Sequence, residues 1–365
     1  DMTVTEFLEA IRRAEQYDGQ IAHVETVPAR EARHGELAAP IAPPLRRALD
    51  ASGIERLYSH QVDAIDTVRE GRNVVVVTGT ASGKTLCYNI PVVERLIDDP
   101  SAKALYLFPT KALAQDQLRG LVRLVEGQSE LLDRVRAGTY DGDTTRHTRR
   151  KLRDEGNVIL SNPDMLHAGI LPYHAKWNRF FKDLRYVVVD EIHTYRGIFG
   201  SNVANVLRRL RRVAGHYGAD PTFVCSSATI ANPRDLAERL TGLPFEVVDN
   251  DGSPRGKKHF VLWNPPYLDV SKMERRSSNV EAHWLMAELI ARDLQTITFG
   301  RARIVAELIY RYARDTLLRI RPEQARKLRP YRGGYLPEER RRIERELFSG
   351  ELMGVSSTNA LELGI

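Results

Sequence analysis

Short runs of β-branched and other apolar residues alternate along the chain with longer stretches of helical spacing, and this alternation constrains the fold most strongly. From residue 73 onward the runs are NVVVVT, ALYLFP, RAGTYD, NVILSN, RYVVVDE, TFVCSSAT and FEVVD. Several are apolar without interruption, as strands are when helices cover both faces of a parallel sheet. The alternation therefore predicts an α/β fold with a doubly wound parallel sheet.

A second series of the same kind follows a stretch rich in Gly, Pro and charged residues at 249–258, which is typical of a linker. Its expected strands are HFVLW, QTITF and ELMGVSST. With 365 residues the chain is long enough for two domains. We therefore expect an accessory helical segment over 1–44, a first domain over 45–248, the linker, and a second domain over 259–365. The printed sequence ends directly after a strand, so the second sheet is expected to be incomplete.

The composition excludes several classes of protein. No apolar run is long enough to span a bilayer, and the first residues resemble no signal peptide. The only two cysteines, Cys87 and Cys225, lie far apart, which supports neither a disulfide framework nor a zinc site within these residues. A reducing, cytoplasmic setting is expected. The net charge of +6 weakly favours polyanionic partners, although most basic residues are expected to be solvated surface.

Residues 78–85, TGTASGKT, lie between the buried run VVVV and a helical stretch. The sequence approaches the phosphate-loop pattern G-x-x-x-x-G-K-[ST], with Thr78 in place of the first glycine. A Ser/Gly turn that caps a helix is the alternative, but the strand–loop–helix context favours phosphate binding by backbone N–H groups, with Lys84 at the outer phosphates and Thr85 on Mg²⁺. The predicted ATP-binding residues of the loop are Thr80, Ala81, Ser82, Gly83, Lys84 and Thr85.

The stretch RYVVVDEIH places Asp190 and Glu191 at the carboxyl end of a buried strand, where open α/β sheets bind ligands. An Asp there can hold Mg²⁺, usually through water, and the adjacent Glu can polarise an attacking water. Alone, such a strand end would more often be surface charge. Together with Lys84, it predicts a Mg²⁺-dependent nucleoside-triphosphate hydrolase.

With SAT at 227–229, the DEIH stretch resembles the superfamily-two helicases of the DEAD/DEAH-box kind. LYSHQ is similar to the adenine-reading Q motif, and FPTKALAQDQ and SNPDML resemble the strand-gripping motifs of a first RecA-like domain. TITFGRAR and VSSTNALELGI resemble the fourth and fifth motifs of a second RecA-like domain. In this family the loop often begins with a small residue, so Thr78 is compatible. Ala81, which replaces a more usual glycine, is the greater departure because it narrows the backbone freedom.

The resemblance assigns roles residue by residue. Tyr58 and Gln61 would bind adenine, and His193 would couple the hydrolysis site to Ser227, Ala228 and Thr229. A motor must move over any sequence, so phosphate contacts at strand-end loops are expected rather than base reading. The predicted nucleic-acid-binding residues are Pro109, Thr110, Lys111, Asn162, Asp164, Arg301, Arg332 and Thr358. Ordinary turn and helix-cap roles are the alternative for these residues.

The combination of LYSHQ, GTASGKTLCY, TYDGDT, SNPDMLH and the long stretch after DEIH resembles a narrower group, the mitomycin-repair helicases of bacteria and their RecQ-four-like fungal relatives. The resemblance implies an ATP- and Mg²⁺-dependent 3′-to-5′ DNA helicase that acts in repair, with single-stranded or tailed DNA and a repair nuclease as partners. It also implies a monomer that works on the nucleoid without a membrane.

The same group carries a C-terminal zinc module, and such helicases complete the ATP site with an arginine from a later motif. Neither lies in the printed sequence, so a chain ending at Ile365 is expected to bind ATP but to hydrolyse it poorly. An RNA helicase and an ATP-gated clamp that does not unwind remain alternatives, because the first-domain motifs do not discriminate among the three.

Overall fold

The chain folds into two compact units, which are described separately. The computed structural model describes residues 2–332, 334–358 and 361. One unit comprises residues 31–255, and the other comprises residues 1–30 together with 256–365. None of the described helices is long and apolar enough to cross a membrane.

Unit 31–255 is built on a seven-stranded sheet in the order β4-β5-β3-β6-β7-β2-β8, in which every neighbouring pair is parallel. The strands are β2 (Val74–Val77), β3 (Lys103–Leu107), β4 (Ala137–Thr139), β5 (Val158–Ser161), β6 (Leu184–Val189), β7 (Thr222–Ser227) and β8 (Glu246–Val248). All seven coincide with the apolar runs of the sequence.

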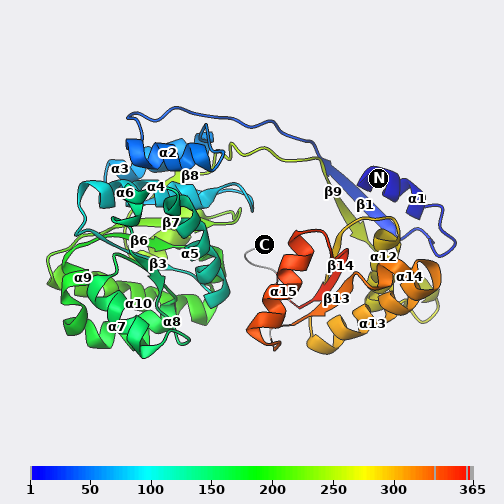
Figure 1. Ribbon diagram of the computed structural model, residues 1–365. Helices are drawn as coiled ribbons and strands as arrows, with labels where there is room; N and C mark the ends of the chain where they lie inside the picture. The colour runs from blue at the N-terminus through cyan, green and yellow to red at the C-terminus, as the bar shows by residue number, and fades with distance from the viewer. Residues whose placement is uncertain (1, 333, 359–360, 362–365) are drawn as a thin grey trace. The chain divides into compact units, whose positions relative to one another are not determined.

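Helices lie on both faces of this sheet; Figure 1 shows α2 and α3 on one side and α9 and α10 on the other. The helices of the unit are α2 (Pro43–Ala51), α3 (Ser59–Arg69), α4 (Lys84–Asp98), α5 (Lys111–Glu126), α6 (Ser129–Leu132), α7 (Arg146–Glu155), α8 (Pro163–Met165), α9 (Asn178–Lys182), α10 (Gly197–His216) and α11 (Pro233–Thr241). A π-helical turn η1 (Leu166–Ile170) and the 3₁₀ segments η2 (Leu171–Trp177) and η3 (Ile192–Thr194) complete it.

Successive residues of one strand enter different cores, which is why the strands are apolar without interruption. Val74 and Val76 of β2 pack with α2, α3 and α4, whereas Val75 and Val77 pack in the cluster formed by η1, η2, α9 and α10. Side chains alternate across a strand, so a sheet covered on both faces needs apolar residues at every position. The predicted doubly wound sheet is confirmed.

The other unit contains a three-stranded parallel sheet in the order β12-β14-β13. Its strands are β12 (Thr296–Phe299), β13 (Leu328–Tyr331) and β14 (Gly354–Ser357), and its helices after residue 256 are α12 (Ser278–Ala291), α13 (Arg303–Ile320), α14 (Pro322–Ala325) and α15 (Pro337–Phe348). Two separate cores flank the sheet, one with α12 and α13 and one with α15. The second parallel α/β domain is therefore confirmed.

The first residues differ from the expected helical segment over 1–44. Among the described residues 2–44, only α1 (Val4–Ile11) and the start of α2 are helical, and β1 (Ile21–Val27) pairs antiparallel with β9 (Lys258–Trp263). α1 buries Phe7 and Ile11 against Trp284 of α12, which places residues 1–30 in the second unit.

Two strand predictions also need correction. HFVLW forms β9, but it pairs with β1 and not with the parallel sheet; exposure alternates along it, which is typical of a strand covered on one face. β13 was not predicted, because Arg329 and Pro330 interrupt its apolar residues. It lies at the sheet edge, where proline is tolerated. A short hairpin of β10 (Tyr267–Asp269) and β11 (Glu274–Arg275) was also missed.

Candidate functional site

The loop 78–83 connects β2 to α4 and adopts the sharp turn that phosphate binding requires. Gly83 is the N-cap of α4 with φ of 79°, a left-handed conformation that favours glycine. A Cβ atom at this position would also lie 2.5 Å from Nε2 of Gln61. Conformation and space thus both demand glycine directly before Lys84.

Ala81 occupies a left-handed conformation as well, with φ of 58°. For a residue with a side chain this costs about 1–2 kcal/mol, so the turn is retained at some energetic cost. The buried hydroxyl of Thr78 lies 2.6 Å from the hydroxyl of Ser82, which holds the two ends of the loop together. Thr78 therefore contributes a bond that glycine could not make.

Lys84 and Thr85 both hold polar partners at the start of α4. The ammonium of Lys84 donates to the carbonyls of Thr78 (3.1 Å) and Gly79 (2.9 Å), so it lies across the loop. The Thr85 hydroxyl donates to Oε1 of Gln117 at 3.0 Å. Outer phosphates and a metal ion could replace these neutral acceptors, because an anion is the stronger partner for an ammonium.

Gln61 joins the predicted adenine-binding segment to the phosphate loop. Its Oε1 accepts from the backbone N–H of Tyr58 (2.9 Å), and its Nε2 donates to the carbonyl of Gly83 (3.0 Å). The side chain is buried in α3, and the Tyr58 ring stacks on His60 with 5.9 Å between centroids. The amide is therefore fixed beside the nucleotide loop.

Asp190 follows β6 and is buried at the carboxyl edge of the sheet. Its Oδ1 accepts from the backbone N–H of Glu191 (2.9 Å) and from the hydroxyl of Ser226 on β7. Burial raises the pKa of Asp190, while these hydrogen bonds and the nearby Lys84 ammonium oppose the rise. The carboxyl is thus positioned on the same edge as the phosphate loop.

Glu191 has φ of 53°, a strained conformation that turns the chain into η3. Burial, with the adjacent Asp190 carboxyl as a second cause, raises the pKa of Glu191 to about 7. A carboxyl with this pKa can exchange a proton near neutral pH, which suits a general base.

His193 links Glu191 to the segment that follows β7. Its Nδ1 lies 3.2 Å from Oε2 of Glu191 and accepts from the backbone N–H of Ala228, also at 3.2 Å. Nδ1 has one lone pair, so it accepts from Ala228 only when it carries no proton and does not accept from a protonated Glu191; a protonated Nδ1 would instead donate to the Glu191 carboxylate. The protonation of this pair is therefore coupled to the Ala228 contact.

The other two residues of the predicted coupling segment are placed differently. The hydroxyl of Ser227 donates to the carbonyl of Ala228 at 2.8 Å, whereas Thr229 is exposed. Of this segment, the backbone N–H of Ala228 contacts His193, whereas the Thr229 side chain is exposed to solvent.

Metal binding at this edge fits Mg²⁺ better than an ion caged by protein. Within the described residues, no group of three or more His, Cys, Asp and Glu side chains could hold a metal ion. Mg²⁺ commonly takes one or two protein oxygens and completes its shell with water and phosphate. The hydroxyl of Thr85 and the carboxyl of Asp190 supply such oxygens.

Two of the predicted nucleic-acid residues are helix caps in this structure. Thr110 accepts from the N–H of Leu113 (3.2 Å) and caps α5, and Asn162 accepts from the N–H of Met165 (2.8 Å) and caps α8. The alternative cap role is thus present, although a cap still leaves backbone N–H groups available for a phosphate. Both follow strands β3 and β5, which are neighbours in the sheet.

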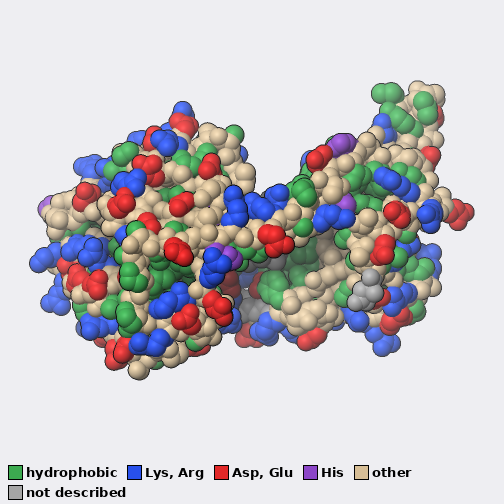
Figure 2. All heavy atoms as spheres, turned by 90° about the horizontal axis from the view of Figure 1, so that it is seen from above, with side chains coloured by type: hydrophobic (Ala, Val, Ile, Leu, Met, Phe, Trp, Pro, Cys, Tyr) green, Lys and Arg blue, Asp and Glu red, His purple; other side chains and the backbone are tan. Residues whose placement is uncertain are grey.

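The remaining predicted contacts of this unit are more accessible. Lys111 is about half exposed and pairs with Asp143 at 3.0 Å, Asp164 is exposed, and Pro109 is half-buried. Figure 2 shows basic and acidic side chains interspersed over the visible surface, so charge alone marks no binding site on the face shown.

In the other unit, Arg301 is exposed after β12, and Arg332 lies after β13 with its guanidinium 4.8 Å from the centre of the Tyr335 ring. Thr358 follows β14. Of the predicted fifth motif, residues 359–360 and 362–365 lie outside the described residues.

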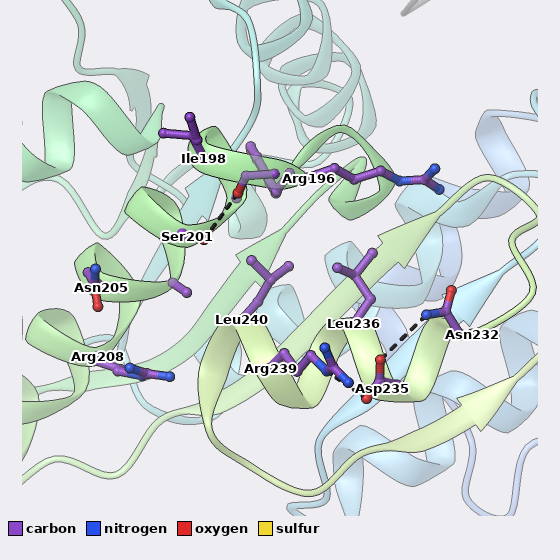
Figure 3. Close-up of a pocket in the computed structure, with 14 residues that line it drawn as sticks. Arg196, Ile198, Ser201, Asn205, Arg208, Asn232, Asp235, Leu236, Arg239 and Leu240 are labelled. Atoms are coloured by element: carbon purple, nitrogen blue, oxygen red, sulfur yellow. Dashed lines mark hydrogen bonds and ion pairs between the residues drawn. The ribbon is translucent and has the colours of Figure 1, made fainter.

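A cavity of about 840 Å³ opens between the start of α10 and α11 and contains none of the predicted ATP-site residues. Figure 3 shows Arg196, Ile198 and Leu236 around it, with Asp235 bonded to Asn232 and Arg239. Asp235 is the one carboxylate among the residues that line this cavity, and it already pairs with Arg239 at 2.8 Å. The cavity lining therefore offers no unpaired carboxylate for acid–base chemistry.

Sequence reasoning missed two residues of the site. Ser226 holds Asp190, and Gln117 holds Thr85 from α5. Ser226 lies directly before SAT, and Gln117 is the last residue of FPTKALAQDQ. Both therefore belong to recognisable motifs, but only strand order and helix packing show which side chains they contact.

Comparison with known proteins defines the class of this site. Residues 58–236 match the family model of the DEAD/DEAH box helicases. These residues contain the phosphate loop, Asp190, Glu191 and the Ala228 contact, so the chain carries a DEAD/DEAH-box helicase domain and belongs to that family.

Particular relatives support the narrower group. The chain is 49% identical over 337 residues to the uncharacterized ATP-dependent helicase YprA of Bacillus subtilis, covering 92% of this chain and 44% of that protein. It is 40% identical to the ATP-dependent helicase HRQ1 of Saccharomyces cerevisiae, covering 100% and 34%. The crystal structure of the helicase MrfA bound to DNA and AMPPNP matches with a TM-score of 0.91 and 45% identity, covering 100% and 50%.

The chain thus spans half or less of the length of these relatives. A DEAD-box helicase, Mss116 bound to RNA, matches with a TM-score of 0.68 at 16% identity, which shows the shared fold of two RecA-like domains. The predicted resemblance is confirmed.

Proposed function

We propose that the chain is the motor part of an ATP-driven DNA helicase that moves 3′-to-5′ and acts in DNA repair. The observation that carries the proposal is the convergence of Lys84, Asp190 and Glu191 on one sheet edge, joined to Ala228 through His193. The 45% identity to a helicase captured with DNA and AMPPNP supports DNA as the nucleic acid.

In this proposal each polar group at the edge has a role in ATP hydrolysis. Lys84 moves from the loop carbonyls to the outer phosphates, where its charge stabilises the transferred phosphoryl group. Thr85 and Asp190 would hold Mg²⁺, which would neutralise developing charge when bound. Glu191 accepts a proton from the attacking water, for which a pKa near neutrality is favourable.

His193 would report the state of the hydrolysis site to the segment after β7. When Glu191 takes up a proton, it no longer stabilises a proton on Nδ1, and the single lone pair of Nδ1 can then accept either from the Ala228 N–H or from the Glu191 hydroxyl. When Glu191 is charged, a protonated Nδ1 is favoured and the Ala228 bond is lost. Hydrolysis could in this way change the position of residues 228–229.

We further propose that phosphate contacts along β3 and β5 hold one strand without reading its sequence. Lys111 and the N-termini of α5 and α8 provide positive potential at this edge. Single-stranded or tailed DNA is the proposed substrate, with a monomer acting on the nucleoid and a repair nuclease as a further partner. An RNA helicase and a clamp that does not unwind are the competing functions.

Strand displacement tests the proposal. The full-length protein should show ATP hydrolysis that single-stranded DNA stimulates, and should displace a strand from 3′-tailed DNA duplexes but not from 5′-tailed ones; Lys84→Ala is the matched inactive control. Preferential displacement of RNA duplexes would establish the RNA alternative. ATP-dependent retention on DNA without displacement would establish the clamp.

The repair role needs a separate test in cells. Removing the gene should sensitise the organism to a DNA crosslinking agent such as mitomycin, and wild-type protein should restore survival while Glu191→Gln should not. Equal survival of the strain without the gene would contradict a role in this repair.

A further inference from the structure

A second pocket lies at the outer end of the same sheet edge, beyond the predicted phosphate contacts. It has a volume of about 380 Å³ and is lined by Tyr140, Arg149, Arg153, Met165, Ala168, Gly169, Tyr173, Lys176 and Trp177. These residues come from the end of β4, from α7, from the last residue of α8, and from η1 and η2; α8, η1 and η2 follow Asn162 in the chain. The volume is within the range of sites for small organic ligands, which is about 300–1,000 Å³.

The pocket combines positive charge with aromatic surfaces. Three of its nine lining residues are cationic, and none of these nine is Asp or Glu. The guanidinium of Arg149 lies 5.6 Å from the centre of the Tyr140 ring, and the ammonium of Lys176 lies 5.5 Å from that of Tyr173. Charge of one sign beside π-faces is the chemistry that binds a phosphate together with a base.

The cations are only partly committed to protein partners. Arg149 donates through Nη2 to the carbonyl of Asp141 (2.7 Å), but its buried Nε has no hydrogen-bond partner among the described residues. The Arg153 side chain is 27% exposed and pairs with the more exposed Asp154 at 3.0 Å, a carboxylate that a phosphate can replace. Tyr173 is 54% exposed and presents its ring to solvent.

The pocket lies in line with the predicted nucleic-acid contacts, and this position indicates which ligand it binds. In the sheet, β4 is the edge strand, β5 is next and β3 follows, so the loops after these strands form one row. That row runs from Lys111, which is bonded to Asp143 of the β4 loop, past Asn162 to the pocket. The phosphate loop follows β2, which lies on the far side of β6 and β7, so the ATP is held elsewhere.

We propose that this pocket binds one nucleotide of the single-stranded DNA, with its phosphate at Arg153 and Lys176 and its base on the face of Tyr173. The inference rests on the proposed function and extends it, because it adds a base-stacking site to an edge that otherwise offers only phosphate contacts. A stacking site accepts any base, so it is compatible with movement over any sequence.

Binding measurements with exposed variants test the proposal. The double variant Arg153→Ala/Lys176→Ala should bind single-stranded DNA about tenfold more weakly and lower the slope of log K against log salt by about 0.7 for each lost phosphate contact. Tyr173→Ala should weaken binding by a similar factor without changing the salt slope. Arg150→Ala, on the same helix α7 but outside the lining, is the matched control and should bind as wild type.

A fluorescent reporter separates direct contact from a structural effect. Single-stranded DNA should quench the emission of a Tyr173→Trp variant in a saturable way, whereas an Arg150→Trp variant should not respond. The Tyr173→Trp variant should also be titrated with oligonucleotides of increasing length. Short oligonucleotides should bind without quenching, and quenching should begin at the length that extends from the contacts near Asn162 into the pocket.

The outcomes distinguish this inference from the proposed function. If wild type binds single-stranded DNA and the double variant matches Arg150→Ala, the pocket proposal alone is wrong. It is also wrong if inorganic phosphate or an acidic peptide, but not DNA, shows the dependence on Arg153 and Lys176. If wild type binds no single-stranded DNA at all, the proposed function falls and the pocket proposal falls with it.

Discussion

The two halves of one sheet edge in unit 31–255 are organised in opposite ways. In the half formed by β2, β6 and β7, the polar side chains are buried and bonded to one another, as Asp190 is to Ser226. In the half formed by β3, β5 and β4, Asp141 and Ser161 are also buried, but the predicted nucleic-acid contacts are helix caps, such as Thr110 and Asn162, or exposed cations, such as Lys111. Both halves lie at strand ends, yet only one is pre-assembled.

The difference follows from what each half has to do. Hydrolysis needs groups fixed within small tolerances, and burial in a low-dielectric site strengthens every electrostatic contact there. A strand that slides needs contacts that form and break with similar ease, which exposed cations and helix N-termini provide. The predicted hydrolysis residues at β2, β6 and β7 (the chemical half) are therefore more buried and more fully hydrogen-bonded than the predicted nucleic-acid contacts at β3, β5 and β4 (the gripping half).

The largest expected effect comes from the buried half. Lys84→Ala should reduce ATP hydrolysis by about 10²-fold or more, because the outer phosphates lose their fixed counter-charge. Binding of single-stranded DNA without ATP should be unchanged, since the Lys84 ammonium contacts only carbonyls of its own loop and none of the predicted DNA contacts. Steady-state hydrolysis and fluorescence anisotropy measure the two properties. A parallel loss of DNA binding would show that the halves are not independent.

Glu191→Gln should slow hydrolysis by about 10²–10⁴-fold and leave ATP binding intact, because the amide cannot accept a proton. In wild type the pKa of Glu191 is raised to about 7, so the carboxyl is protonated, and inactive as a base, at pH below that value. The kcat/KM for ATP should therefore fall about tenfold per pH unit below 7. The variant should lack this acid limb; an identical profile in both would remove Glu191 as the base.

In the gripping half, two variants should separate stability from binding. Asn162→Ala removes the cap of α8 and should lower the free energy of unfolding by about 1 kcal/mol in urea titrations.

Lys111→Ala should leave the free energy of unfolding nearly unchanged, because the ion pair of Lys111 is exposed. It should lower the slope of log K for DNA binding against log salt by about 0.7. If Lys111→Ala keeps the wild-type slope, Lys111 makes no phosphate contact.

The smallest effect is expected from Ala81→Gly. Glycine relieves the left-handed strain at φ of 58° but adds freedom to the unfolded chain, so stability should change by less than about 1 kcal/mol. ATP affinity should change by less than about fivefold. Thermal unfolding and nucleotide titration measure both quantities. A large loss would mean that the methyl group of Ala81 contacts the nucleotide or its loop directly.

The sequence by itself determined the doubly wound sheet and which residue types stand at its edge. Unbroken apolar runs require two covered faces, and TGTASGKT and DEIH are local patterns whose residue types and order already specify a turn before a helix and a carboxyl pair after a strand. These predictions succeeded because the physics that supports them acts within a few residues.

Only the tertiary structure decided what depends on contacts between distant residues. Pairing of β1 with β9 joins residues 21–27 to 258–263, and no pattern in either segment names the other. The bond from Ser226 to Asp190 and the pocket beyond Asn162 likewise depend on strand order. A one-dimensional pattern records which face a residue prefers, whereas its partner is chosen by packing of the whole sheet, where many segments compete for the same place.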